Sequence, residues 1–409
     1  MELRPILSTL RRHKTTAWLL VLEIALTCAI VCNAVFMINH RLDHMQMPTG
    51  IDEHGLVQIQ VAEVAPLPDV YARAREDLAV IRQVPGVRAV TLVSQLPLTP
   101  SSSNANVMLD PMQRTPSLNA GTYFGLDLVQ TMGLRLVAGR DLRPEEVLDA
   151  DVALKLVAAG QTDAFAPVTV VTQAMAQRLW PGANPLGKVL YLGPISVRVV
   201  GVVAELARAN AYDDATAQYS MILPMFMGAG KDQSYLIRTR PQDRQAVLKA
   251  AVAALKKADS RRVVTTQRTY DEVREKFFEN DRSMAGILVG AIAALLIVTA
   301  LGIVGLASFW VAQRRRTIGV RRALGATRRN ILNYFLTENF LLATIGIALG
   351  MVLAYGINLF LMTRYELPRL PAVYFPVGAV ALWMIGQLAV LGPALRAAAV
   401  PPVVATRSV

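Results

Sequence analysis

The chain has 409 residues, of which 53% are hydrophobic and 18% are charged, so it is rich in aliphatic residues and long enough for more than one domain. Its formal net charge is +12, and its two cysteines are too few for a disulfide framework. Residues 39–283 carry 27 Lys and Arg against 26 Asp and Glu. This balance argues against a nucleic-acid-binding protein, which would carry a clustered basic face on a soluble domain.

Four long apolar runs divide the chain. Each run reaches the roughly 20 residues that a helix needs to cross about 30 Å of hydrocarbon. Buried helices of a large soluble protein seldom exceed about 20 residues and carry a polar face, so this alternative does not fit the runs. We therefore predict four transmembrane helices, at residues 17–38, 284–312, 331–362 and 374–395.

The first run has two other interpretations, and we reject both. A signal peptide would have a shorter apolar core followed by a small-x-small cleavage site. A lipoprotein would carry a small residue before its lipidated cysteine, whereas Thr27 precedes Cys28 and Val31 precedes Cys32. The two cysteines are four residues apart on one helix face, and we expect them to pack there as small apolar residues.

The positive charge is concentrated outside the large loop. Residues 1–16 carry four basic residues against one acidic residue, residues 313–330 carry seven against none, and the tail after 395 carries two against none. Four spans place these three segments on one side of the membrane, and the positive-inside rule makes that side cytoplasmic. We predict a cytoplasmic, amphipathic N-terminal segment (1–16), a cytoplasmic loop (313–330) and a cytoplasmic tail (396–409). Residues 39–283 and the short loop 363–373 are then external.

The external segment 39–283 alternates between strand and helix patterns. Strands at 56–64 and 87–94 flank a helix at 68–84, and strands at 234–239 and 262–268 flank a helix at 244–259. Two such units separated by other residues predict a split α+β domain with an insertion at about 98–188.

Three further elements are predicted around this insertion. Residues 168–180 read as a strand that leads into a helix, and residues 189–205 as a hairpin around Gly193. From about Asp271 a helical pattern continues into the second span, which predicts one stiff helix leaving the membrane.

The stretch `GANPLGKV` (182–189) is one residue short of the P-loop pattern G-x-x-x-x-G-K-[ST], because Val189 replaces Ser or Thr. A P-loop follows a strand and precedes a helix, whereas here a predicted helix comes before and a predicted strand after. Pro185 lies where backbone N–H groups would hold phosphate, and Val189 offers no Mg²⁺ ligand. We interpret the stretch as a turn and expect no nucleotide, cofactor or metal to bind it.

The segment `QRRRTIGVRRALGATRRNILNYFLTENFLLATIGIALG` (313–350) closely resembles the cytoplasmic loop and third span of FtsX-type, MacB-like ABC transporter permeases. The stretches 122–142 and 171–203 and the tail 392–407 are also similar to that family. One departure is Thr317, where the family often has Glu.

The resemblance implies a transmembrane subunit in the inner membrane of a bacterial cell, with four helices and an external domain that combines a porter-like part with an inserted part. It also implies a mechanotransmission mechanism, in which stalk helices carry ATP-driven motion to the external domain. ATP and Mg would then bind a separate cytoplasmic ABC ATPase dimer.

The family also suggests partners. These are a second copy of the chain or a paralogous permease, a periplasmic membrane-fusion adaptor and an outer-membrane channel. Regulation of cell-wall hydrolases, as in FtsX proper, and lipoprotein release remain alternatives. The large external domain favours export, and the sequence does not identify the substrate. A membrane-anchored enzyme is a further alternative, but no catalytic constellation is identifiable.

The loop between the second and third spans has two interpretations. Its arginines are a positive-inside signal near anionic lipid, and by resemblance the loop also forms a coupling helix that docks on the ATPase. Leu324 would be its apolar anchor and Gly325 would end the helix. The predicted coupling residues are Thr317, Ile318, Gly319, Arg321, Arg322, Ala323, Leu324, Gly325, Ala326 and Thr327.

Several residues inside or near the spans also stand out. Glu23 and Glu338 each need a partner or a proton within the membrane, and we expect them to snorkel or to pair with nearby arginines, with a proton relay as the alternative. Two small-xxx-small pairs predict helix packing within the subunit or a dimer, rather than contact with lipid. They are Gly286 with Gly290 and Gly346 with Gly350. His40 and His44 share a helix face near His54, but lack an evident third zinc ligand.

Overall fold

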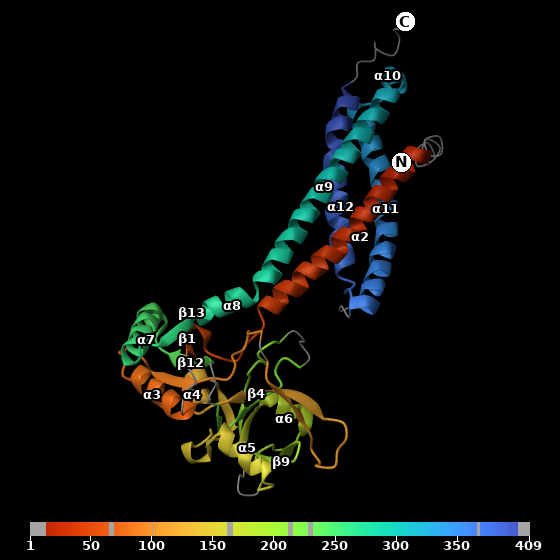
Figure 1. Ribbon diagram of the computed structural model, residues 1–409. Helices are drawn as coiled ribbons and strands as arrows, with labels where there is room; N and C mark the ends of the chain where they lie inside the picture. The colour runs from red at the N-terminus through yellow and green to blue at the C-terminus, as the bar shows by residue number, and fades with distance from the viewer. Residues whose placement is uncertain are drawn as a thin grey trace. The chain divides into compact units, whose positions relative to one another are not determined.

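A computed structural model describes residues 14–64, 69–100, 102–161, 167–211, 216–227, 232–365 and 369–399. The chain forms two compact units, which we describe separately (Figure 1). One is the helical unit, made by the residues up to Met45 and those from Asn280 onward. The other is the external unit, Gln46–Glu279. The predicted segment 1–16 and the tail 396–409 lie largely outside the described residues.

Within its described residues, the helical unit contains four helices that are long and apolar enough to cross a membrane, as predicted. Each extends beyond the apolar run that predicted it. They are α2 (Lys14–Met45), α9 (Glu279–Gln313), α11 (Arg328–Tyr365) and α12 (Tyr374–Ala398).

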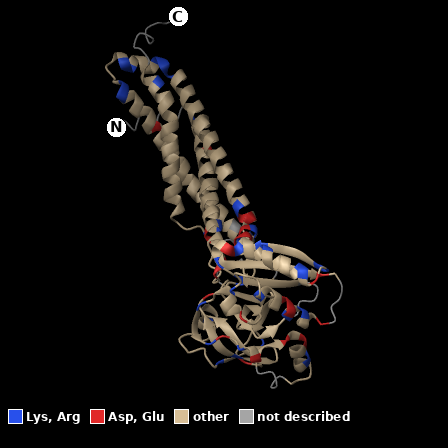
Figure 2. Cartoon of the chain, turned by 90° about the vertical axis from the view of Figure 1, so that its left-hand side faces the viewer, with Lys and Arg blue, Asp and Glu red and all other residues tan. Residues whose placement is uncertain are grey.

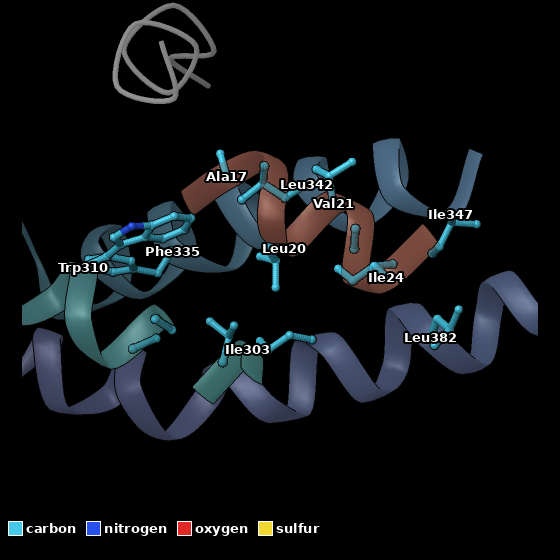
Figure 3. Close-up of a cluster of buried hydrophobic side chains, with 14 of the residues drawn as sticks. Ala17, Leu20, Val21, Ile24, Ile303, Trp310, Phe335, Leu342, Ile347 and Leu382 are labelled. Carbon is cyan, nitrogen blue, oxygen red and sulfur yellow. The ribbon is translucent and has the colours of Figure 1, made fainter. Parts of the chain in front are cut away.

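Small residues allow α11 to approach α2 closely. A Cβ atom added to Gly346 would lie 2.8 Å from the Cβ of Ile24, and one added to Gly350 would lie 2.5 Å from the Cβ of Cys28. Cys28 and Cys32 are both buried in the same apolar core. Figure 3 shows how this core gathers side chains from several helices, including Leu20 on α2.

Helix α9 packs far less than α2. Of the residues in its most apolar 18-residue stretch, 11% are buried, against 67% in the corresponding stretch of α2. The hydroxyl oxygens of Thr27 and Thr299 lie 2.8 Å apart and join α2 to α9. A Cβ added to Gly286 or Gly290 would meet no described atom within 4 Å. None of the described residues therefore packs on these two glycines, and a packing role for them points to a second chain.

The external unit contains a four-stranded sheet. Its strands come from the two predicted strand-helix-strand units. Its strand order is β13-β1-β12-β2, and all pairs are antiparallel. Helix α3, capped at its N-terminus by Asp69, and helix α7 contribute to the same apolar core. The elements are β1 (Leu56–Glu63), α3 (Val70–Arg82), β2 (Ala89–Leu92), β12 (Asp232–Arg238), α7 (Arg244–Ala258) and β13 (Arg262–Thr269).

A buried ion pair joins elements of this four-stranded part. The side chains of Asp77 on α3 and Arg262 on β13 are fully buried and paired. The hydroxyl of Tyr235 donates to Asp77 Oδ2 at 2.8 Å, and Arg262 Nη1 donates to the Leu255 carbonyl at 2.8 Å. Burial raises the pKa of Asp77, whereas the hydrogen bond from Tyr235 and the charge of Arg262 oppose the rise. The pair ties helix α3 to the edge of the sheet.

Seven further strands of the external unit form a second sheet in the order β3-β4-β10-β7-β9-β5, with β8 paired to β9. As predicted, β7 leads into helix α6 (Gln173–Leu179), and β8 and β9 form a hairpin at Gly193. The strands are β3 (Asn104–Val107), β4 (Leu118–Phe124), β5 (Leu136–Gly139), β7 (Val168–Thr172), β8 (Val189–Leu192), β9 (Ile195–Val203) and β10 (Ser220–Leu223). A further short pair joins β11 (Met225–Phe226) to β6 (Leu148–Asp149).

Several shorter helices complete the external unit. They are η1 (Glu53–Gly55), α4 (Leu128–Met132), η2 (Pro144–Glu146), α5 (Ala150–Ala158) and η3 (Pro241–Asp243).

Two boundaries differ from the predictions. The inserted part extends to Leu223, because β9 pairs with β7 and β10 pairs with β4, so the predicted end at residue 188 is too early. The predicted continuous helix from Asp271 is two helices, α8 (Tyr270–Phe277) and α9, which meet at Phe278. Neither glycine nor proline marks that break, so the helical pattern alone did not locate it.

Candidate functional site

The loop after α9 forms a short helix, α10 (Arg315–Ala323), that ends at a glycine. Gly325 has a φ of +96°, its N–H donates to the Arg322 carbonyl at 3.2 Å, and the Ala326 N–H donates to the Arg321 carbonyl at 3.0 Å. This is a Schellman cap. The helix therefore ends before Thr327, whose hydroxyl instead accepts the Asn330 N–H at the start of α11. The coupling helix predicted at Thr317–Thr327 thus starts and ends later in the sequence than α10 does.

One face of α10 is fixed to the helical unit. Ile318 and Gly319 are buried, and Ile318 belongs to the common apolar core. Arg322 Nη1 donates to the Ala398 carbonyl of α12 at 2.9 Å. The guanidinium of Arg321 lies 5.2 Å from the ring centre of Tyr334 on α11, within cation–π range. Contacts with both α11 and α12 therefore hold the helix in place.

A buried ion pair supports the start of α10. Nη1 of Arg314 lies 2.9 Å from Oε2 and 3.1 Å from Oε1 of Glu338, and the Glu338 side chain is 1% exposed. The same guanidinium lies 5.7 Å from the ring centre of Trp310. Glu338 thus pairs with an arginine of the loop. We call this contact the Arg314–Glu338 clamp.

The opposite face of α10 is exposed among the residues that the structure describes. Leu324 is 83% exposed and Val320 is 46% exposed, and exposed Arg315 and Arg316 lie on the same short helix. Figure 2 shows Lys and Arg residues, coloured blue, gathered along the backbone at the end of the helical unit that carries α10. The arrangement is a short helix, held on one face, that presents exposed apolar side chains beside exposed arginines.

Glu23 lies in a different environment. On α2 it faces α9, where an added Cβ at Gly302 would lie 2.5 Å from Glu23 Oε1. Among the described residues, no hydrogen-bond donor or cation contacts its carboxylate. The expected pairing is therefore observed for Glu338, whereas the arginines that precede Glu23 in the sequence lie outside the described residues.

Several backbone N–H groups of the stretch 182–189 are already bonded within the protein. It lies between α6 and β8, so a helix comes before it and a strand follows. The Gly187 N–H donates to the Val199 carbonyl at 2.8 Å, and the Lys188 N–H donates to the Pro185 carbonyl at 3.1 Å. Because these groups bond within the protein, the loop is a closed turn and does not form an anion cradle.

The histidines near the end of α2 do not converge. Nδ1 of His44 lies 3.6 Å from an oxygen of Asp281, and Nδ1 of His54 lies 3.5 Å from an oxygen of Asp271. The ring of His40 stacks on Phe36. Within the described ranges, no group of three or more His, Cys, Asp or Glu side chains is placed to hold a metal ion.

Comparison with known proteins identifies the family. Residues 24–255, more than half of the chain, match the MacB-like periplasmic core domain, and residues 289–402 match the FtsX-like permease C-terminal domain. The chain belongs to the MacB-like family of ABC transporter permeases. The predicted resemblance is confirmed, and the α10 loop lies within the FtsX-like permease region.

Several curated relatives share the matched region. The macrolide export ATP-binding/permease protein MacB of Acinetobacter baylyi is 29% identical over 247 residues, covering 58% of this chain and 37% of that protein. The pyoverdine export ATP-binding/permease protein PvdT of Pseudomonas putida is 30% identical over 254 residues, covering 59% and 38%. The match therefore spans well under half the length of these two relatives.

Two further similarities complete the comparison. The uncharacterized ABC transporter permease YvrN of Bacillus subtilis is 26% identical over 252 residues, covering 59% of this chain and 62% of that protein. The crystal structure of the periplasmic region of MacB from Actinobacillus actinomycetemcomitans is 16% identical, with a TM-score of 0.35, and covers 58% of this chain and 97% of that structure.

Proposed function

We propose that this MacB-like permease couples ATP hydrolysis, carried out by a cytoplasmic ATPase outside these 409 residues, to motion of its external unit and so drives export of a substrate. The exposed Leu324 carries this proposal. It stands on a helix whose other face is fixed to α11 and α12, so a force applied at its tip is transmitted to the spans. The two relatives named as export ATP-binding/permease proteins support the direction of transport.

The proposed topology places α10 in the cytoplasm. Seven arginines and no acidic residue lie in 313–330, whereas the external segment is almost neutral, and this asymmetry supports a cytoplasmic loop. On this basis the protein lies in the inner membrane with both termini cytoplasmic. A second copy or a paralogous permease would cover the exposed face of α9, which carries Gly286 and Gly290.

The coupling role is tested by Leu324→Asp. If Leu324 is buried in an ATPase groove, the variant places an unpaired carboxylate there, and loss of such an interface anchor costs about 2 kcal/mol or more, roughly thirtyfold in affinity. We expect the variant to insert normally and to lose the ATPase during purification, or to retain the ATPase while losing transport.

Met112→Asp is the matched control, because Met112 is 86% exposed and lies in the external unit. It should retain both the ATPase and transport. Normal co-purification and normal transport by Leu324→Asp would show that the loop is only a basic topology signal.

The proposed adaptor and outer-membrane channel are tested separately, by crosslinking the protein in intact cells and identifying the captured chains. Capture of an adaptor or channel supports export. Capture of a cell-wall hydrolase would favour the FtsX-like signalling alternative.

A further inference from the structure

The second sheet of the external unit closes into a small barrel. Around the ring the strand order is β3-β4-β10-β7-β9-β8. The ring closes where Met108, directly after β3, pairs with Tyr191 on β8. The Met108 N–H donates to the Tyr191 carbonyl at 3.0 Å, and the Tyr191 N–H donates to the Met108 carbonyl at 2.8 Å.

Strand polarity brings six strand ends to one opening of this barrel. β3 and β9 begin there and β4, β8 and β10 end there, while Pro167 immediately precedes β7. At this opening lies a cavity of about 210 Å³, lined by twelve residues. We call it the barrel mouth. Mouths of β-barrels are common sites for small ligands.

The lining of the barrel mouth is mostly apolar and carries no charged residue. Phe124, Leu192, Ile195 and Met225 line the cavity and are only partly buried, although all four are large apolar side chains. Val197 and Leu223 also line the cavity and are buried. Covering such surface is favourable by about 25 cal/mol per Å² of apolar area removed from water. None of the twelve lining residues is Asp, Glu, Lys, Arg or His, so nothing there would compensate a ligand charge.

A fixed polar edge lies on one side of the barrel mouth. The hydroxyl oxygens of Ser103 and Thr122 lie 2.8 Å apart. The side chain of Gln95 fixes the backbone of both residues. Its Oε1 accepts the Ser103 N–H at 2.6 Å, and its Nε2 donates to the Thr122 carbonyl at 2.9 Å. Ser103 is exposed, so its hydroxyl can exchange a hydrogen bond with a ligand.

We propose that the barrel mouth binds a small uncharged ligand that has an apolar ring or short branched alkyl group and a hydroxyl or amide. The apolar group would fill the cavity and the polar group would bond at Ser103. Drug-sized ligands occupy pockets of about 300–1,000 Å³, so a larger molecule would insert only one such group. The site lies within one sheet, and its occupancy does not depend on the proposed coupling at α10.

The test uses the full chain in phosphatidylcholine nanodiscs, with Cys28→Ala and Cys32→Ala and one reporter cysteine. Leu192→Cys reports from the cavity. Ser196→Cys is the matched control, because Ser196 is exposed on the neighbouring strand and does not line the cavity. The probe is benzyl alcohol, and the measurement is the rate of thiol modification.

We expect the probe to slow modification at Leu192→Cys by about tenfold at about ten times its Kd, following mass action, and to leave Ser196→Cys unchanged. Ala105→Phe, which places a ring in the cavity, should abolish this protection. Unchanged labelling of Ser196→Cys in the Ala105→Phe background would show that the barrel still folds.

Benzoate and benzylammonium carry the same ring with a charge, and neither should protect at the same concentrations. The proposal is overturned by any of three results: equal responses at the two cysteines, protection that survives Ala105→Phe, or equal protection by the charged probes.

Discussion

Arg314 and Glu338 connect the end of α9 to α11, because one guanidinium nitrogen lies within 3.1 Å of both carboxylate oxygens. The two residues are 24 positions apart in sequence and flank α10. Any displacement of α10 must therefore move α9 and α11 together or break this contact.

The first prediction concerns this clamp. Arg314→Ala or Glu338→Ala alone leaves a buried charge unpaired, which should lower the free energy of unfolding by about 3–5 kcal/mol. The double variant Arg314→Met with Glu338→Leu removes both charges and should recover most of that loss. Unfolding of the purified chain in a denaturing detergent series measures these differences. Additive losses in the double variant would show that the two charges do not stabilise each other.

The second prediction compares the effect on stability of a leucine placed in each of the two glycine pairs. Gly346→Leu inserts atoms where Ile24 already lies within 2.8 Å of a Cβ position, so overpacking should destabilise the chain by about 1–3 kcal/mol or more. Gly286→Leu meets no described atom within 4 Å and should leave the stability of a single chain unchanged.

If a second copy covers α9, Gly286→Leu should instead weaken dimer formation, measured by crosslinking across concentration. If Gly286→Leu lowers the stability of the single chain as much as Gly346→Leu does, α9 packs within the chain. Unchanged dimerisation would place the partner surface elsewhere.

The third prediction concerns topology. In a background without Cys28 and Cys32, cysteines at Met112 and Ser260 should react with a membrane-impermeant reagent in intact spheroplasts, since both positions are exposed in the external unit. Leu324→Cys should react only after lysis. The reverse labelling pattern would show that the protein has the opposite orientation in the membrane, and that α10 is not cytoplasmic.

The sequence predicts those features that depend on neighbouring residues. Apolar length is a local property, and the four spans appear where it placed them. The split strand-helix-strand pattern also follows from local periodicity. The end of α10 at Gly325 was predictable as well, because a glycine with positive φ is a common helix terminator.

Features that depend on distant residues were not predictable. The closure between Met108 and Tyr191 joins strands more than 80 positions apart and leaves no periodic signal, so the barrel and its mouth were not foreseen. The local pattern predicts the hairpin after residue 188 but does not show that it belongs to the inserted part, because the pairing of β9 with β7 is also non-local. The choice of Arg314 as the partner of Glu338 also depends on tertiary packing.

The interleaving of the two sheets has a consequence for biogenesis. β1 pairs with β12 and β13, and the side chains of Gln58 and Ser234, which share a hydrogen bond, are 176 residues apart. If the chain crosses the membrane in the proposed orientation, the first strand-helix-strand unit crosses before β12, the strand that lies between β1 and β2, because the whole barrel sequence comes in between. Exposed strand edges of this kind favour aggregation, and non-local pairing slows folding. With the external topology proposed above, we expect this first unit to need a chaperone, or rapid completion of the chain, to avoid aggregation.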